Sequence, residues 1–411
     1  MKSSRNLKKF LLALTTGCMI AACTTNDNPS VTVPELVVQT TVGGTEQYYS
    51  GLTMQMGLAE SSTPIASATI DAAGKATFSV DPRQFEGKAM WFGVERMVKF
   101  FHTLADMESV SGKLTLPDME KGSTLDETRL RNDWIVALYM GVNKGGEATG
   151  APLYWATGDL ISYKTNGSGE PTQVAFHIAT DEETIWEATE TNDFVKTDER
   201  LVGNSDGYIN MPQGTHWNLY CFGDKTGLCL YFGFDQLDKL LIATGQMKGD
   251  DIVYDISGNP NYDIATAALG GTWRMATGGK TGKNEFAAFE DNCEEYASLL
   301  PNGVTYGEEM NGFGVKFDHE IVIDGRKIVT NTLRFPAVGF RHGTESWDIG
   351  KSLFYWTGTA DPTMTPIFGM EPGSYEPTPQ MIAFNFGWVL QQFNWFAHSR
   401  MSGAAVRPVT E

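Results

Sequence analysis

Five oxygen-bearing residues gather within a fourteen-residue stretch, and their side chains are the ligand type that Ca²⁺ prefers: Asp250, Asp251, Asp255, Asn259 and Asp263. Their spacing is not that of a D-x-[DN]-x-[DN]-G calcium loop. A solvated acidic turn, in which Asp263 caps a helix, is the favoured alternative. The six histidines show no paired metal-binding spacing, and no G-x-S-x-G elbow is present. We therefore expect no metal, no cofactor and no hydrolase chemistry.

A second group of residues imitates a phosphate-binding loop. Residues 278–284 read GGKTGKN and lie between an expected strand and an expected helix. Gly278 and Gly282 are one position too close for a P-loop, and Asn284 replaces the Ser or Thr that would hold Mg²⁺. Nucleotide binding is not expected, and the chain is predicted not to be an enzyme.

The amino terminus carries a pattern for covalent lipid attachment at Cys23. Residues 10–20 form an apolar stretch too short to span a bilayer, preceded by four basic residues: Lys2, Arg5, Lys8 and Lys9. Ile20-Ala21-Ala22-Cys23 matches a bacterial lipobox. Cys18 is a rival acceptor with a poorer preceding sequence, and an ordinary cleaved secretory peptide is the alternative. The pattern predicts a lipoprotein signal peptide at 1–22, palmitate at Cys23 and, because Thr24 is not Asp, an outer-membrane position.

Charge excludes several classes of partner. Loss of four of the 31 basic residues with the signal peptide leaves 27 against 50 acidic ones, a net charge of −23. Such a surface repels phosphate backbones, so no nucleic-acid partner is expected.

The 44 glycines and many aromatic residues favour a fold rich in loops and strands.

The expected elements divide the mature chain into a stalk and two domains. Residues 23–34 are short, polar and proline-bearing, which predicts a flexible stalk. Residues 35–124 contain about five short strands, enough for a small β-sandwich, with a hairpin that turns at Gly74. Within this range, residues 94–108 could contain a short helix instead of strand.

The second domain is expected at 133–411. Asp263 is predicted to cap a helix over 264–269 that ends at Gly270 and Gly271, and Asn284 to cap a helix over 285–300. The latter places four residues on one stripe: Phe286, Phe289, Cys293 and Tyr296. The fold class is therefore α+β and mostly β, with few short helices. A hairpin over 217–234 would bring Cys221 and Cys229 close enough to form a disulfide, and two reduced core cysteines are the alternative.

Several segments of the second domain occur in the order of one known family. Residues 255–277, DISGNPNYDIATAALGGTWRMAT, resemble the most characteristic stretch of the Fibrobacter succinogenes major paralogous domain. Further similar segments are LYWATGDLI at 153–161, LRFPAVGFRHG at 333–343, LFYWTGT at 353–359 and SGAAVRPV at 402–409. Ala276 replaces the usual Pro, and GGKTGK is an insertion.

This resemblance implies a C-type-lectin-like core similar to that of formylglycine-generating enzymes, with no shared catalytic residues. Formylglycine chemistry itself would need a reactive cysteine pair near the carboxyl end, and the last cysteine is Cys293. Seven residues in expected strand contexts are predicted to have structural roles, because aromatic and buried-Arg packing needs no ligand. They are Trp273, Arg274, Phe335, Pro336, Tyr355, Trp356 and Arg407. The amino-terminal sandwich with its lipid signal is similar to fimbrillin-like surface proteins.

One segment is the candidate ligand site. Residues 360–380 are proline-rich and are expected to form a long loop on a rigid sheet, where binding function tends to lie. Five side chains are the candidate binding residues: Phe368, Met370, Glu371, Tyr375 and Trp395. The alternative is a loop that covers the aromatic sheet face as core.

The function expected from these features is that of a non-enzymatic cell-surface lipoprotein. It would be an adhesin or a pilus-associated anchor, accessory or tip protein (a fimbrium component), with pilus subunits, a host protein or a glycan as partner. A glycan-binding lipoprotein for polysaccharide capture is the alternative.

Overall fold

The structure, a computed structural model, describes part of the chain. The described residues are 34–40, 42–43, 49–117, 119–120, 134–170, 173–179, 213–214, 216–227, 247–248, 251–252, 255–279, 283–297, 314–323, 326–336, 338–342, 345–347, 352–366, 375–385, 393–397 and 402–411. Residues 34–411 form one compact unit. The predicted signal peptide, Cys23 and most of the predicted stalk lie outside the described residues.

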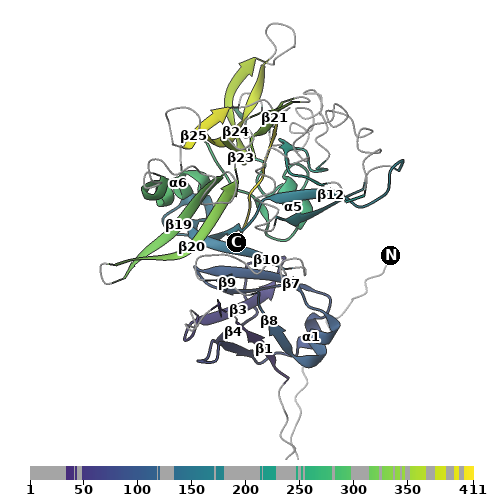
Figure 1. The fold of residues 1–411 in the computed structure, drawn as a ribbon, viewed down its shortest axis with the longest axis vertical. Coiled ribbons are helices and arrows are strands. Elements are labelled where there is room, and N and C mark those ends of the chain that lie inside the picture. Colours follow the sequence, from purple (N-terminus) through teal and green to yellow (C-terminus); the bar gives the residue numbers. More distant parts are fainter. Residues whose placement is uncertain are drawn as a thin grey trace, which may run out of the picture. The chain divides into compact units, whose positions relative to one another are not determined.

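The largest element is an antiparallel eight-stranded sheet (Figure 1). Its order is β18-β27-β11-β10-β7-β6-β3-β4. The strands are β3 (Thr53–Leu58), β4 (Ala66–Thr69), β6 (Ala89–Val94), β7 (Val98–Thr103), β10 (Ile135–Asn143), β11 (Pro152–Ala156), β18 (Arg274–Met275) and β27 (Pro408–Thr410). The β7–β10 pairing joins residues from the two ranges predicted as separate domains, 35–124 and 133–411. Those limits remain predictions, but one hydrogen-bonded sheet runs through both ranges.

A smaller sheet faces the amino-terminal part of the large one. Its order is β5-β1-β8, formed by β1 (Leu36–Gln39), β5 (Lys75–Phe78) and β8 (Lys113–Thr115). Inward side chains alternate along β1, where Leu36 and Val38 are fully buried. Next to it, β2 (Val42–Gly43) pairs with β9 (Met119–Glu120) in parallel.

The predicted turn at Gly74 is confirmed, and the predicted hairpin is wrong. Gly74 has φ +75°, and Asp71 Oδ1 accepts the Ala73 and Lys75 N–H groups. Only Ile70 and Ala76 bridge across the turn, because β4 pairs with β3 and β5 pairs with β1. The turn therefore carries the chain from one sheet to the other. The helix considered for 94–108 is also displaced: 98–103 form β7, and α1 spans Asp106–Ser111.

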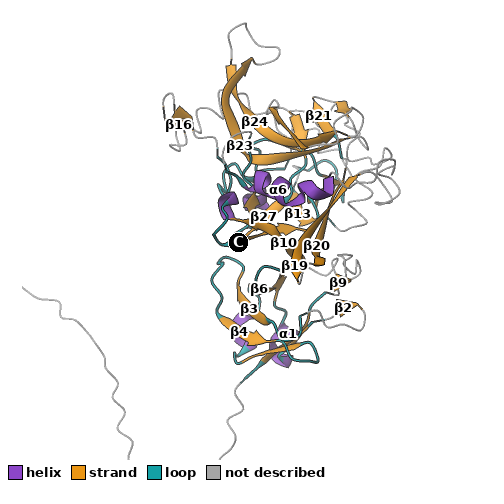
Figure 2. Cartoon of the chain, turned by 90° about the vertical axis from the view of Figure 1, so that its left-hand side faces the viewer, coloured by secondary structure: helices purple, strands orange, loops and turns teal. Residues whose placement is uncertain are grey.

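The remaining strands form several small sheets (Figure 2). They are β12 (Leu160–Lys164), β13 (Val174–Ile178) and β14 (His216–Trp217); β15 (Tyr220–Cys221), β21 (Phe340–His342), β22 (Glu345–Trp347) and β26 (Ser402–Ala404); β16 (Met247–Lys248) and β17 (Asp251–Ile252); β19 (Gly314–Ile323) and β20 (Arg326–Pro336); and β23 (Ser352–Pro366), β24 (Tyr375–Asn385) and β25 (Phe393–Ala397). The prediction of a mostly-β α+β fold with few short helices is confirmed. The C-type-lectin-like layout stays a prediction.

Both predicted helix starts are confirmed. Helix α5 spans Ile264–Leu269 after its cap Asp263 and ends at Gly270, and α6 spans Glu285–Ala297. Asn284 Oδ1 accepts the Ala287 N–H at 2.8 Å, as an N-cap does. Phe286 and Phe289 of the predicted stripe are buried against Trp155. Two 3-10 turns, η1 (Pro82–Phe85) and η2 (Lys144–Gly146), complete the helical elements described. No helix among the described residues is both long and apolar enough to cross a membrane.

Candidate ligand-binding pocket

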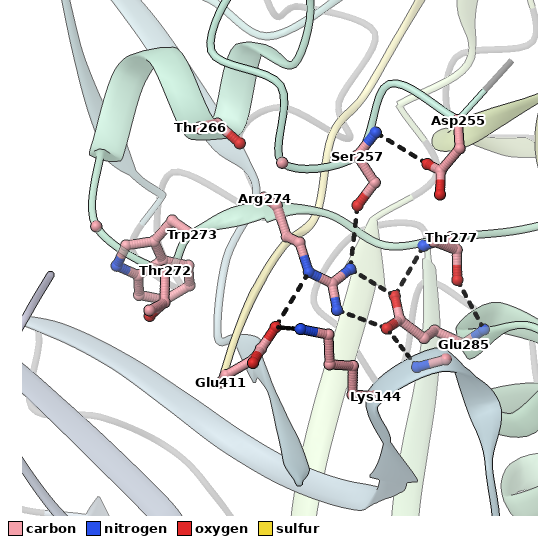
Figure 3. Close-up of a pocket in the computed structure, with 13 residues that line it drawn as sticks. Lys144, Asp255, Ser257, Thr266, Thr272, Trp273, Arg274, Thr277, Glu285 and Glu411 are labelled. Atoms are coloured by element: carbon pink, nitrogen blue, oxygen red, sulfur yellow. Dashed lines mark hydrogen bonds and ion pairs between the residues drawn. The ribbon is translucent and has the colours of Figure 1, made fainter. Parts of the chain in front are cut away.

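A pocket of about 460 Å³, lined in part by charged and hydroxyl side chains, lies where η2, α5, β18 and the start of α6 meet the residue after β27 (Figure 3). Thirteen residues line it: Lys144, Gly145, Asp255, Ser257, Gly258, Thr266, Gly271, Thr272, Trp273, Arg274, Thr277, Glu285 and Glu411. They come from three stretches of the chain that are far apart in sequence: 144–145, 255–285 and residue 411. The pocket is therefore a product of the tertiary fold and not of one motif.

Asp263 fixes the segment that builds one side of this pocket. Its Oδ1 accepts the Ala265 and Thr266 N–H groups at the start of α5, at 2.9 and 3.2 Å. Its Oδ2 accepts the Gly258 and Met275 N–H groups at 2.7 and 2.8 Å. One fully buried carboxylate thus ties a turn, a helix and a strand together. Burial raises the pKa of Asp263, and these N–H groups act in the opposite direction.

An ion pair between Arg274 and Glu285 forms the base of the pocket. Nη1 donates to Oε2 at 2.7 Å and Nη2 to Oε1 at 2.5 Å, a bidentate pair. Glu285 also accepts the N–H groups of Gly145 and Thr277, each at 2.8 Å. Burial alone would raise the pKa of Glu285, but the hydrogen bonds and charge of Arg274 lower it overall. Both Glu285 oxygens are therefore engaged, and the carboxylate stays ionised.

Glu411 closes the other side of the pocket. Its Oε1 lies 2.6 Å from Lys144 Nζ and 3.9 Å from Arg274 Nε. The Lys144 side chain is 56% exposed, so its ammonium group faces solvent as well as Glu411. It is the most accessible cation of the pocket.

Asp255 supplies a carboxyl group beside these ions. Its Oδ1 accepts the Ser257 N–H at 3.0 Å, and Ser257 Oγ in turn donates to Met275 O and accepts from Arg274 Nη1. The residue keeps exposed surface, but surrounding atoms desolvate the carboxyl group and raise the pKa of Asp255.

The chemistry of the pocket suits a ligand rich in hydroxyl groups. Arg274 pairs with Glu285 and Lys144 pairs with Glu411, and Asp255 adds one further carboxyl group, so a phosphate would meet no excess of positive charge. Lys144, Asp255 and several hydroxyl side chains remain at the surface of the pocket. No histidine is among the thirteen lining residues, so Ser257 has no histidine base in this pocket.

The residues predicted as a binding site are not part of this pocket. Phe368, Met370 and Glu371 lie outside the described residues, as does Cys23. Tyr375 and Trp395 lie on neighbouring strands, β24 and β25. Trp395 pairs with Ile382, seven residues from Tyr375, which is about 20 Å along a strand. The structure does not bring these two positions together.

The predicted loop at 360–380 is wrong over much of its length. Residues 360–366 continue β23 and 375–380 begin β24, and the two arms pair, with Ala360 opposite Pro379 and Pro366 opposite Tyr375. Irregular register at two places lets this pairing tolerate the prolines. A hairpin therefore replaces most of the expected loop.

The structural roles predicted for several residues are confirmed. Arg407 is almost fully buried, with Nε 2.8 Å from Asp159 Oδ1 and its guanidinium 4.3 Å from the Phe335 ring centre. Tyr355 donates its hydroxyl to Asp159 Oδ2. Trp273 is 3% exposed and contacts Phe101, with ring centres 4.9 Å apart. Cys221 is buried on β15, whereas Cys229 lies outside the described residues, so their disulfide stays a prediction.

Sequence reasoning did not predict this pocket, although nine of its thirteen lining residues lie in the segment 255–277. Lys144 and Glu411 carry no local signal, because the residues they meet are more than a hundred positions away along the chain. Asp255 was included only as a calcium-ligand candidate. Among the described residues, no group of three or more His, Cys, Asp or Glu side chains is placed to hold a metal ion.

Comparison with known proteins gives no relative. No family model matches the chain, and neither a curated protein nor a solved structure matches it. The resemblance to the Fibrobacter succinogenes major paralogous domain rests on the sequence segments alone.

Proposed function

We propose that the chain is a non-enzymatic lipoprotein of the outer membrane, exposed on the cell surface as an adhesin or as an anchor, accessory or tip protein of a pilus. The observation that carries the proposal is the lipobox that ends in Cys23 behind a basic and apolar leader. The resemblance to fimbrillin-like and C-type-lectin-like proteins is consistent with it.

The position of β1 supports a tethered role over that of a pilus shaft subunit. Shaft subunits of the fimbrillin type resemble a design in which an Arg-specific protease removes the first strand, so that a neighbour's strand replaces it. Residues 24–74 contain no Lys or Arg. The first basic residues, Lys75 and Arg83, lie in β5 and η1, after four strands. Cleavage after Lys75 or Arg83 would separate β1 from the rest of the fold. Because β1 is the central strand between β5 and β8, the core would then lose Leu36 and Val38.

Two measurements test the tether. Cys23→Ala should move the protein from the membrane fraction to the soluble fraction, while Cys18→Ala, the matched control, should leave it in the membrane. Amino-terminal sequencing of the native protein should find a blocked, lipidated Cys23. A mature start between residues 30 and 90, or unchanged membrane partition of Cys23→Ala, would contradict the proposal.

The pocket favours a second function, glycan binding for polysaccharide capture. Both of its cations are paired with carboxylates, and Lys144, Asp255 and hydroxyl side chains surround a volume suited to a sugar unit. A glycan array with the wild-type protein should give hits that weaken in Lys144→Ala and in Asp255→Asn. Lys283→Ala is the control, because the Lys283–Glu147 pair lies on the surface, with side chains 68% and 52% exposed. Hits of equal strength in all variants would exclude this pocket as the glycan site.

A further inference from the structure

Helix α1 exposes two apolar side chains to solvent. Met107 is 82% exposed and Val110 is 71% exposed, the highest values among the large apolar residues that the structure describes as exposed. The two residues are three positions apart in the helix and so share one face. Exposed pairs of this kind on a fixed element mark a contact surface more often than scattered single residues do.

The helix is held rigidly, so this face is a fixed feature. Glu108 Oε2 accepts the Ala105 N–H at 2.8 Å and lies 2.8 Å from His102 Nε2. The His102 ring stacks on Trp134 with ring centres 4.3 Å apart. Ser109, on the inner side, is 1% exposed. The outward direction of Met107 and Val110 is therefore set by contacts on the opposite side of the helix.

Helix α1 also lies where the chain enters the fold from its amino terminus. Its carboxyl end, Gly112, accepts the Val37 N–H at 2.8 Å, and a Cβ on Gly112 would meet Glu35 O at 2.5 Å. Figure 1 shows α1 beside β1 and β8. Only ten residues lie between Cys23 and Pro34, and the eleven steps from one Cα atom to the other span at most about 40 Å when fully extended. A lipid on Cys23 thus keeps Pro34, where the chain enters the fold beside this helix, within about 40 Å of the bilayer.

We infer that Met107 and Val110 of α1 insert into the headgroup and acyl boundary of the membrane that carries the Cys23 lipid. This inference rests on the proposed lipid anchor. The charged residues nearest to the two side chains along the chain are two acidic ones, Asp106 and Glu108, and one basic one, Lys113. They offer no excess of positive charge, so apolar burial and not attraction to anionic lipid is the driving interaction. A lipid anchor on a flexible stalk leaves the fold free to rotate. A second contact through α1 would hold the fold in one orientation on the membrane.

The test uses the full lipidated chain in vesicles of phosphatidylethanolamine and phosphatidylglycerol. Met107→Cys and Val110→Cys, each labelled with an environment-sensitive fluorophore, should show a blue shift and quenching by doxyl-labelled lipid. Ile65→Cys, at a position 47% exposed near β4, is the matched control and should show neither. The unsubstituted chain gives the background from native cysteines, and the same labelled variants with Cys23→Ala in buffer give the emission in water.

Flotation of the vesicles separates the two proposals. A chain that floats with its lipid but keeps the emission in water at both positions overturns the membrane contact and leaves the anchor standing. A blue shift without quenching by doxyl-labelled lipid shows that the face is covered by protein, such as a second copy of this chain, and not by lipid, which also overturns it. A chain that does not float overturns the anchor and the contact together.

Discussion

The Arg274 guanidinium holds the Glu285 carboxylate through both terminal nitrogens, at 2.7 and 2.5 Å, and the Glu285 side chain is 1% exposed. Removal of one partner from such a pair leaves an uncompensated buried charge. We expect Glu285→Gln to lower the free energy of unfolding by about 3 to 5 kcal/mol, measured by denaturant titration.

The exposed Glu147–Lys283 pair is the control for that substitution. Its atoms are 2.9 Å apart, almost the same distance, but both side chains are more than half exposed. Glu147→Gln should therefore change the free energy of unfolding by less than about 1 kcal/mol. Equal effects of the two substitutions would show that Glu285 is not a buried partner.

Lys99 gives the protein a dependence of stability on pH. Its Nζ lies 4.1 Å from the Trp91 ring centre and 2.5 Å from the main-chain oxygen of Glu411. Burial lowers the pKa of Lys99 from 10.5 to about 8, although the charges of Glu411 and Glu95 oppose this. Between these two pH values the unfolded chain binds the proton and the folded chain does not, so stability rises with pH. The full rise corresponds to about 3 kcal/mol.

Lys99→Met should remove this rise. The free energy of unfolding of each protein is measured by denaturant titration at several pH values from 7.5 to 10. Over this range the wild type should gain stability relative to the variant, because only the wild type carries this lysine. The range ends at pH 10 because Tyr154, which lies beside Lys99, changes stability above that pH. Burial raises the pKa of Tyr154 from 10.0 to about 12, so the unfolded chain loses this proton at a lower pH than the folded chain does. Identical pH profiles for the two proteins would mean that Lys99 is not desolvated.

Trp273 connects the pocket to the large sheet. Its ring is 3% exposed and lies in a cluster with Phe101, Tyr154 and Trp91. Trp273→Ala should cost about 3 to 5 kcal/mol of stability, seen as a lower melting temperature. Val329→Ala is the comparison, since Val329 is 41% exposed and should lose little. An unchanged melting temperature for Trp273→Ala would remove this residue from the core.

Alanine substitutions at two adjacent glycines in η2 distinguish the cost of backbone strain from the cost of a steric clash. Gly145 and Gly146 both have positive φ, +71° and +69°. A Cβ at 146 would lie 2.2 Å from Asn284 O, at the start of α6, whereas a Cβ at 145 meets nothing closer than 4.0 Å. Gly145→Ala should cost about 1 kcal/mol and Gly146→Ala about 1 to 3 kcal/mol more, measured by denaturant titration. Equal losses of stability in the two variants would show that the backbone at Asn284 shifts to accommodate the new Cβ atom at little cost.

The sequence determined the features that depend on neighbouring residues. Asp263 and Asn284 each cap a helix by accepting N–H groups two or three residues ahead, so residue type and position suffice to predict them. Gly74 and Gly270 end elements because they adopt positive φ at little cost. Short apolar segments bounded by turn residues likewise predicted the mostly-β class.

Only the tertiary structure decided which strands pair and which charges meet. The turn at Gly74 is compatible with a hairpin or with a step between sheets, and the partner strands β1 and β3 determine which one forms. The prolines at 360–380 suggested a loop, but pairing with irregular register accommodates them. Lys144 and Glu411 meet across 267 positions of sequence. Their encounter depends on the packing of β10, β11 and β27 in one sheet, a long-range interaction that local sequence does not encode.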